Sequence, residues 1–519
     1  MDMAIALASG IGAFAALGLL AMLLGDRYAR TTGMALELGI LVCLVLSMAS
    51  IALVVGYGPS TAALISRDGL GLTIRLDAVS LSITTLVCFV GWIVLRFSRT
   101  YLGEEPRRAA FQGWLALTLA SVLIFACSGN LFQLVVAWIA TSVSLHKLLL
   151  FYPDRAAAQR AARKKYITAR IADVAMLGAA VSLAVAYGTY DIAAILDAAR
   201  YGQGGTFAFI GAICLAAAAV IKSAQFPLHG WLTEVMEAPT PVSALLHAGV
   251  INAGGFVLIR FADVMILAPG VLAALVMIGG FTALFGGLVM LTQPAVKTSL
   301  AWSTVAQMGF MIMQCGLALF PLALLHILAH SLYKAHSFLA SGGAVERIAA
   351  SRRPGPVAIP SAKAVLRAFL AALAIYAVIG WAFGIHEKSP QSSALGAILI
   401  FGVAYLLAQG LAGAAPAALL RRMAAYSIAA SIGYFALHGL ADWLTLGILP
   451  PTPDPGPLEW ALIVLAVISF GLVAIAQAMF PLWAYHPAAA GLRVHLSNGL
   501  YANAMFDRLI GGWALRRSI

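Results

Sequence analysis

The chain has 519 residues, of which 10% are charged and 62% are hydrophobic, and its formal net charge is +12. A soluble domain carries roughly 25% charged residues, so this composition excludes an ordinary soluble protein and indicates a membrane protein. The basic excess would suit a nucleic-acid partner, but most basic residues lie in short segments between long apolar runs. That distribution is typical of membrane topology and argues against nucleic-acid binding.

Fifteen apolar segments are long enough to span a bilayer, because a spanning helix needs about 20 mostly apolar residues. We therefore expect an all-α polytopic membrane protein with about 15 transmembrane helices. No basic region precedes the first segment, so we expect it to be retained rather than cleaved as a signal peptide. The expected spans are residues 3–24, 33–56, 77–95, 109–127, 130–152, 168–188, 206–225, 240–260, 270–292, 298–319, 321–342, 364–385, 394–413, 424–447 and 458–482.

The basic residues between these spans predict the orientation of the chain. If the N-terminus is periplasmic, most of the 32 Lys and Arg residues fall in cytoplasmic segments. Five fall on the periplasmic side: Arg67, Arg75, Arg200, Arg260 and Lys388. This is the positive-inside bias. We expect a multi-pass protein of a bacterial cell inner membrane with a cytoplasmic C-terminus.

The sequence indicates no cofactor of its own. Its five cysteines fall in or beside apolar spans without a CxxC pair, so neither disulfides nor an iron–sulfur site is predicted. No phosphate-binding glycine motif follows a plausible strand.

The stretch 216–260 carries the strongest functional signal. Lys222 lies near the end of an apolar helix, Pro227 interrupts that helix, and His247 lies in the next one. An ionisable group in a membrane span is costly and is a functional candidate by default, and broken helices at membrane depth persist where protein or water surrounds them. We expect Lys222 to take up and release a proton, with His247 as a relay. The alternatives are a lysine locked by a buried carboxylate and a hydrogen-bonded core histidine.

A second polar helix lies at 321–342. His326, His330 and Lys334 recur every four residues and so share one face. The pattern HxxxH also suits a metal, but no third ligand is apparent and Lys334 would repel a cation. We therefore expect a row of residues that pass a proton along, and no metal. Lys297, at the start of the preceding helix, is either a link to one aqueous side or an ordinary interface lysine.

Other polar residues have weaker signals. His146, near the end of the fifth span, is a relay candidate, whereas Lys147 can extend to the membrane surface. Arg170 and Asp173 are three residues apart and can pair on one helix face, most simply as a structural clamp. The basic run 154–170 suits anionic headgroups or a soluble partner. Residues just beyond the Pro227 break are either part of the path or ordinary solvated groups: His229, Glu234 and Glu237.

These features divide the chain into four parts. Residues 1–127 hold the first four spans, and 128–345 hold a proton-conducting core. Residues 346–482 hold the last four spans, and 483–519 form a cytoplasmic amphipathic tail that we expect to lie on the membrane or on a partner.

Three runs resemble the proton-conducting membrane transporter family: KSAQFPLHGWLTEVMEAPTPVSALLHAG at 222–249, VKTSLAWSTVAQMGFM at 296–311 and HILAHSLYKAHSFLASG at 326–342. That family includes the antiporter-like membrane subunits of respiratory complex I and of sodium/proton antiporters. The resemblance implies two inverted five-helix repeats and a broken helix 7. It also implies a central carrier at Lys222, with further path residues at His247, Lys297, His326, His330 and Lys334.

Two departures from the family pattern concern its charged residues. Pumping members carry a glutamate after the tryptophan of the fifth helix, but here Ile139 follows Trp138. His146 lies two turns along the same face and is a candidate replacement. A broken twelfth helix with a buried lysine is not recognisable.

Three sequence motifs resemble those of the DabB family: FPLHGW, KAHSFLASG and SLHKLLLFY. Members of that family are the membrane subunits of two-component inorganic-carbon accumulation complexes. This resemblance implies a large soluble, cytoplasmic DabA-like partner that holds zinc and performs the chemistry, so the chain itself is not expected to be an enzyme. The alternatives are a subunit of an NADH-quinone oxidoreductase or sodium/proton antiporter complex, and a passive membrane anchor for a soluble enzyme. The sequence leaves proton against sodium open.

Overall fold

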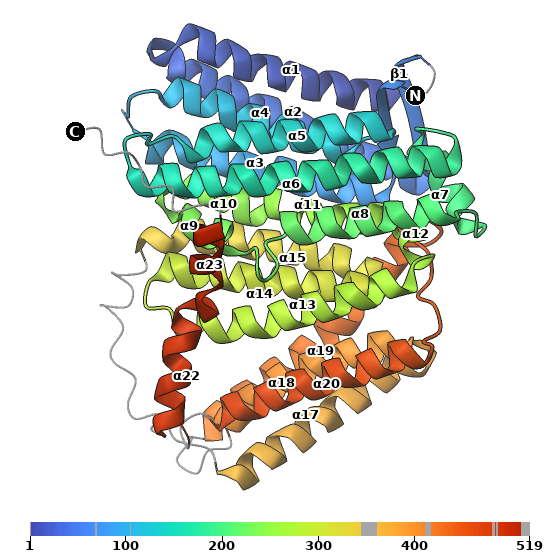
Figure 1. Cartoon of the computed structure of the whole chain (residues 1–519), viewed down its shortest axis with the longest axis vertical. Helices are drawn as coiled ribbons and strands as arrows, with labels where there is room; N and C mark the ends of the chain where they lie inside the picture. Colours follow the sequence, from blue (N-terminus) through green and yellow to red (C-terminus); the bar gives the residue numbers. More distant parts are fainter. Residues whose placement is uncertain are drawn as a thin grey trace.

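The computed structural model describes residues 2–67, 70–103, 105–343, 361–410, 417–479, 483 and 486–509. Most long helices lie side by side and cross the molecule in the same direction (Figure 1). The helices of the first half are α1 (Asp2–Leu24), α2 (Ala29–Tyr57), α3 (Ala78–Tyr101), α4 (Arg108–Ala126), α5 (Leu131–Leu149), α6 (Ala156–Tyr187), α7 (Ile192–Arg200) and α8 (Thr206–Lys222).

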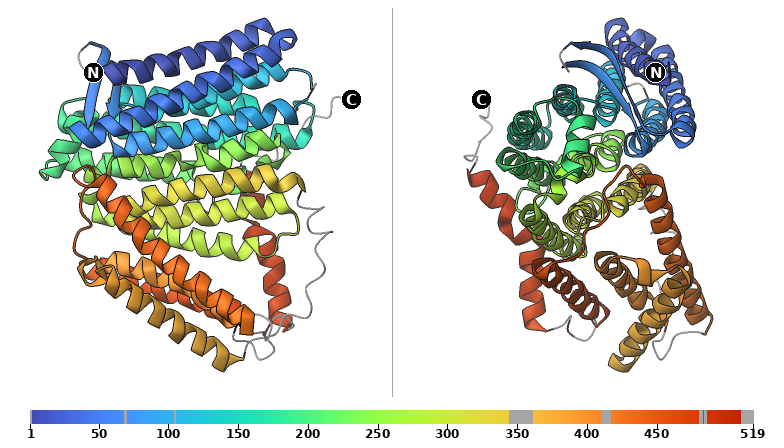
Figure 2. Two further views of the ribbon diagram at one scale, coloured as in Figure 1. Left: turned by 180° about the vertical axis from the view of Figure 1, so that it is seen from behind. Right: turned by 90° about the vertical axis from the view of Figure 1, so that its right-hand side faces the viewer.

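The central helices are α9 (Gly230–Glu234), α10 (Thr240–Ala248), α11 (Ala253–Arg260), α12 (Ala262–Ile266), α13 (Pro269–Met290), α14 (Val296–Gly316) and α15 (Phe320–Leu339). Four further long helices lie in the lower part of Figures 1 and 2: α17 (Ala362–Ala382), α18 (Pro390–Gly410), α19 (Ala417–Thr445) and α20 (Pro457–Ala478). Of these, α19 also packs on α15 and α20 on α13. The tail contributes α22 (Pro487–Ser497) and α23 (Ala502–Leu509).

This architecture confirms the predicted all-helical membrane fold. Each expected span is occupied by a long helix or, in two cases, by a broken one. Within the described ranges, 11 helices are long and apolar enough to cross a membrane. Two shorter apolar helices, Thr206–Lys222 and Pro390–Ala404, add to these.

A β-hairpin between α2 and α3 is the element that the sequence reading missed. Strands β1 (Ser60–Arg67) and β2 (Leu70–Leu76) pair antiparallel, with Ser60 opposite Leu76. The expected spans 33–56 and 77–95 leave residues 57–76 as a plain connection. The missed signal was the alternation of apolar and polar residues on both sides of an Asp-Gly pair. The hairpin packs on the start of α5, where the Gln133 side chain accepts a hydrogen bond from Thr73 N at 2.8 Å.

The interior of the bundle is formed by α10 and α11. Every residue of α10 is buried, and so is nearly every residue of α11. Helix α10 packs on α15 and α3, and α11 packs on α8, α14 and α15. An apolar helix buried on all sides reports a position at the centre of a large bundle.

The tail helices cross the other helices rather than running along them (Figure 1; Figure 2, right). Gln293 Nε2, beyond the end of α13, donates to Ser497 O at 3.3 Å. The Asn503 side chain contacts Lys164 Nζ at 2.8 Å and also donates to Glu234. We expected the tail to lie on the membrane or on a partner, but α22 and α23 pack on the chain's own helix ends.

Candidate functional site

The seventh span is broken directly after Lys222, as its proline predicted. Helix α8 ends at Lys222, residues 223–229 are not helical, and α9 begins at Gly230. Pro227 lies within this break. Side chains satisfy part of the freed backbone, as membrane-depth breaks require: Phe226 N donates to Thr282 Oγ1 at 3.2 Å.

Lys222 is buried, with 6% of its surface exposed. Its Nζ lies 4.4 Å from the centre of the Trp138 ring, an arrangement that attracts a cation to the face of the indole. Among the described residues, Nζ has no hydrogen-bond partner. The predicted alternative, a lysine locked by one carboxylate, therefore does not describe its immediate contacts.

A second break, in the eighth span, was not predicted. We expected one continuous helix over 240–260, but α10 ends at Ala248, and a 3₁₀ turn over Val250–Asn252 precedes α11. The Asn252 side chain donates to Ala248 O at 3.1 Å, so it satisfies a carbonyl that the break leaves free. It also donates to Ser331 Oγ at 2.9 Å, which joins the break to α15.

The two breaks meet at a cavity. Its volume is about 30 Å³, and its lining includes Trp138, Thr141, Lys222, Gly249 and Asn252. One water molecule needs roughly 10–15 Å³ by this measure and polar partners around it. By volume the cavity therefore has room for about two waters, and its lining includes both Lys222 and the broken backbone of the eighth span at Gly249 and Val250.

The polar face of α15 lies beyond this cavity. His330 and Lys334 are buried, and His326 is half-buried. The rings of His326 and His330 are 6.0 Å apart, and His326 Nδ1 lies 2.8 Å from Gln314 Oε1. Lys334 Nζ donates to Ser303 Oγ at 2.7 Å. All three residues thus face neighbouring helices, and two of them contact polar groups of α14.

His247 is fully buried between α14 and α15. Its Nδ1 lies 3.0 Å from Thr304 Oγ1, and its ring stacks on Phe338 with 4.3 Å between centroids. The charge of Lys334 acts on His247 and on His330. His247 and Lys334 also contact adjacent residues of α14, Thr304 and Ser303.

Lys297 lies at the end of the bundle where α10 and α14 begin. Its Nζ donates to Thr240 Oγ1 at 3.2 Å, and its side chain is half-buried. Helix α9 is at the same end because it precedes α10 by a few residues, and Lys164 is there because it pairs with Glu234, the last residue of α9. We call this the Lys164 end, at the left of Figure 1.

Lys164 corrects a prediction about the basic run 154–170. We expected the run to face headgroups or a partner, but Lys164 is 4% exposed. Its Nζ lies 2.7 Å from Glu234 Oε1 and 2.6 Å from Asp507 Oδ1. Glu234 is thus an ion-pair partner rather than an ordinary solvated group. Lys165 is also buried, and the sequence reading missed it too. The available signal was the spacing of Lys165, Ala169, Ala172 and Met176, which share one buried helix face.

Arg170 and Asp173 pair as expected, with 2.6 Å between Nη2 and Oδ2. Asp173 is buried, and both charges act on Lys222. His146 is half-buried, with its ring 5.3 Å from that of Tyr166, and the charge of Lys165 acts on it. The role of His146 as a replacement for the absent glutamate stays a prediction. Lys147 is exposed, which fits the membrane-surface alternative.

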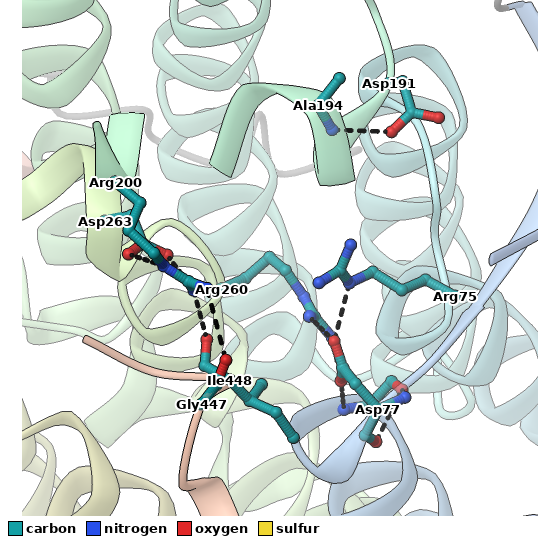
Figure 3. A network of polar contacts seen from close by, with 10 residues as sticks. Arg75, Asp77, Asp191, Ala194, Arg200, Arg260, Asp263, Gly447 and Ile448 are labelled. Atoms are coloured by element: carbon teal, nitrogen blue, oxygen red, sulfur yellow. Dashed lines mark hydrogen bonds and ion pairs between the residues drawn. The ribbon is translucent and has the colours of Figure 1, made fainter. Parts of the chain in front are cut away.

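The opposite end of the bundle, the Arg260 end, is held by buried ion pairs (Figure 3). Asp77 caps α3 through Ser80 N, and its carboxylate lies 2.5 Å from Arg260 Nη1 and 2.7 Å from Arg75 Nε. Asp77 and Arg260 are both nearly inaccessible to solvent. The cap and the pairing together give Asp77 a structural role.

A second pair at this end joins α7 to α12. Arg200 Nε lies 3.1 Å from Asp263 Oδ1. The same guanidinium donates to Gly447 O at 3.3 Å and to Ile448 O at 3.0 Å (Figure 3). The segment after α19 is thereby attached to the central helices.

Two family models match the chain. The model described as NADH:quinone oxidoreductase/Mrp antiporter, TM covers residues 128–353, and the one described as NADH-Ubiquinone oxidoreductase (complex I), chain 5 N-terminus covers 68–112. The longer match contains both helix breaks and α15, so it coincides with the site.

Relatives of known name include probable inorganic carbon transporter subunits. DabB2 of Halothiobacillus neapolitanus is 37% identical over 450 residues, 85% of this chain and 80% of that protein. DabB of Hydrogenovibrio crunogenus is 44% identical over 295 residues, 56% of this chain and 57% of that protein, so the match spans little more than half of this relative.

Among solved structures, the Mrp complex from Dietzia sp. DQ12-45-1b contains a chain of the same fold. The TM-score is 0.64 at 23% identity, covering 99% of this chain and 59% of that one. The matched family models, the long alignment with DabB2 and the shared fold agree with one another. The chain belongs to the family of antiporter-like membrane subunits found in complex I and Mrp complexes.

Proposed function

We propose that this chain conducts protons as the membrane subunit of an energy-coupled inorganic-carbon accumulation complex. The observation that carries the proposal is the buried Lys222 amine. It has no hydrogen-bond partner among the described residues and borders a cavity with room for water at two helix breaks. An amine that can exist with or without its extra proton, and that reaches water, can load and release that proton.

The rest of the path follows from polar contacts between neighbouring helices. The Asn252–Ser331 hydrogen bond links the Lys222 cavity to α15 at the level of His330. From there His326 and Gln314 continue along α15 and α14. Water within the cavity supplies the short transfer distances that a proton relay requires.

A second branch leads from α15 toward the Lys164 end. Lys334 contacts Ser303, and His247 contacts Thr304, the next residue of α14. Lys297 is one of the last charged groups of this branch, bonded to Thr240 at the start of α10. In the proposed orientation this end is cytoplasmic, so Lys297 links the path to that side.

The coupling to inorganic carbon rests on the names of the relatives. Two of them are called probable inorganic carbon transporter subunits. In the proposed complex, proton flow through this chain drives a large soluble DabA-like zinc subunit on the cytoplasmic side to hydrate CO2 to bicarbonate. Proton flow through this chain then supplies the energy, and the partner holds the zinc.

A second candidate is proton translocation within a sodium/proton antiporter or quinone oxidoreductase complex. The family match and the fold shared with an Mrp complex subunit favour it. Purification from the native membrane separates the two candidates. A single zinc-containing soluble partner supports the carbon complex, whereas iron–sulfur and quinone-site subunits support the oxidoreductase.

The role of Lys222 is tested by growth at limiting CO2. We expect Lys222→Ala to abolish carbon-dependent growth while the complex still assembles. Lys147→Ala, which removes an exposed lysine of α5, is the matched control and should grow normally. Normal growth with assembled Lys222→Ala would refute the role. A fully active complex lacking both Lys222 and His330 would instead support a passive membrane anchor.

A further inference from the structure

A second, smaller cavity also borders Lys222. Its volume is about 10 Å³, close to the minimum for one water molecule. Its lining includes Lys165, Thr168, Lys222, Trp231 and Val250. Lys222 and Val250 line the larger cavity as well. Both cavities are therefore bordered by Lys222 and Val250, and the smaller one is also bordered by a second buried lysine.

The amine of Lys165 is held in a defined position. Lys165 is 4% exposed, and its Nζ donates to Ser142 O at 2.6 Å and to Ser142 Oγ at 3.1 Å. An ammonium group has three donors, so Ser142 occupies two of them. The third is available to a water molecule in the cavity that Lys165 shares with Lys222.

The surroundings of the two amines favour exchange of a proton between them. The charge of Lys222 acts on Lys165, so two ammonium groups here repel each other. Asp173 and Arg170, the charged groups nearby, pair with each other and add little net charge. Trp231, which also lines the cavity, is a buried donor without a partner among the described residues and accepts no proton.

We propose that Lys165 is a relay residue that receives the proton from Lys222 on a separate route toward the Lys164 end, between α5 and α6 rather than along α15 and α14. The assignment rests on the proposed proton conduction and adds a residue to it. Lys165 then takes the place next to the central lysine that Ile139 leaves without a titratable group. His146 of α5, on which the charge of Lys165 acts, is the next titratable group on this α5–α6 route.

The test measures proton flux into vesicles that contain the purified full complex. A potassium diffusion potential drives the flux, and a pH-sensitive dye inside the vesicles reports it. Lys165→Arg and Lys165→Gln both keep a donor for Ser142, but arginine does not release its proton and glutamine carries none to release. We expect each to lower the flux by about 100-fold, the lower end of the effect of losing a proton-transfer group.

The neighbouring Lys164→Arg is the matched control. Its amine binds Glu234 and Asp507 rather than the cavity, and arginine keeps those ion pairs. We expect its flux to stay within about twofold of the wild type, a difference of roughly 0.4 kcal/mol in barrier height. Thermal unfolding midpoints of all variants confirm that each one is folded before its flux is compared.

The outcomes separate the inference from the function beneath it. If both Lys165 variants are folded and conduct like the wild type, while Lys222→Leu does not conduct, the inference is overturned and the proposed function stands. In that case Lys165 only clamps α6 to α5 through Ser142. If the wild-type complex conducts no better than protein-free vesicles, both are overturned.

Discussion

Lys222 and Arg260 are both buried cations in this bundle, yet their contacts assign them different roles. Arg260 meets the Asp77 carboxylate through two nitrogens, at 2.5 and 3.1 Å. Lys222 meets an indole face and a cavity instead. Paired with a carboxylate, Arg260 has a structural role, whereas a buried amine beside a cavity and without a carboxylate partner is a candidate for proton exchange.

Removing the Arg260 charge should destabilise the protein. Arg260→Met leaves the buried Asp77 carboxylate with Arg75 alone, and breaking a buried ion pair typically costs about 3–5 kcal/mol. Thermal unfolding of the purified protein in detergent, followed by loss of soluble material, measures the change. Arg155→Met is the control, because Arg155 pairs with Glu237 at the surface, where the two side chains are 54% and 46% exposed, and should cost no more than about 1 kcal/mol. Equal shifts for the two variants would contradict the structural role of the Arg260 pair.

For single residues, the sequence predicted those whose role can be recognised from their immediate neighbours in the chain. Lys222 and His330 are titratable side chains in apolar runs, and both are buried. Lys164 and Lys165 were missed because a basic run resembles a solvated surface. Their burial depends on partners distant in sequence, such as Glu234 and Asp507 for Lys164. Local sequence patterns do not identify partners that are distant in the sequence.

The helix breaks show the same limit for whole elements. Pro227 predicted the break in the seventh span, because proline lacks the backbone N–H donor and clashes with the preceding turn of a helix. The break after Ala248 contains glycine but no proline, and its stability depends on Asn252 bonding Ser331 of α15. Tertiary contacts thus hold a break that local propensity does not specify.

The pair α13 and α14 shows how glycines set the distance between elements. A Cβ on Gly279 would lie 2.5 Å from Met313 N and 2.6 Å from Gly309 O, and one on Gly309 would lie 2.5 Å from Ala283 N. Gly286 and Gly316 make similar backbone contacts. Small residues that let backbones approach closely are a common source of helix association in membranes.

Enlarging one of these glycines should separate the two helices. We expect Gly279→Leu to destabilise the protein by about 1–3 kcal/mol or more, the usual cost of overpacking. Gly287→Leu, on the same helix, is the control, because nothing lies within 4 Å of a Cβ there. Thermal unfolding midpoints of the two variants give the comparison. A stable Gly279→Leu protein would show that the close packing of α13 on α14 is dispensable.

The whole molecule has two chemically different ends. Ion pairs around Asp77 and Asp263 close the Arg260 end, whereas Lys297, Lys164 and the docked tail occupy the other. The sequence predicted which charges share an end, since Arg75, Arg200 and Arg260 fall together as the positive-inside count placed them. It did not predict the tail's contacts, which join residues more than 300 positions apart.

The proposed orientation is tested by labelling cysteines in intact cells. Tyr201→Cys lies at the Arg260 end, where Tyr201 is 85% exposed, and Asp154→Cys lies at the Lys164 end, where Asp154 is exposed. A maleimide that does not cross membranes should label Tyr201→Cys in whole cells. It should label Asp154→Cys only after the inner membrane is opened. The reverse pattern would invert the proposed topology.

Proton flux through vesicles carrying the purified complex tests the path itself most directly. With a potential imposed across the membrane, the wild type should acidify the vesicles. Lys222→Leu and His330→Ala should each lower the flux by about 100-fold, as the loss of a proton-transfer group does, while Lys147→Leu should conduct normally. Wild-type flux in folded Lys222→Leu and His330→Ala would show that protons do not pass along these side chains.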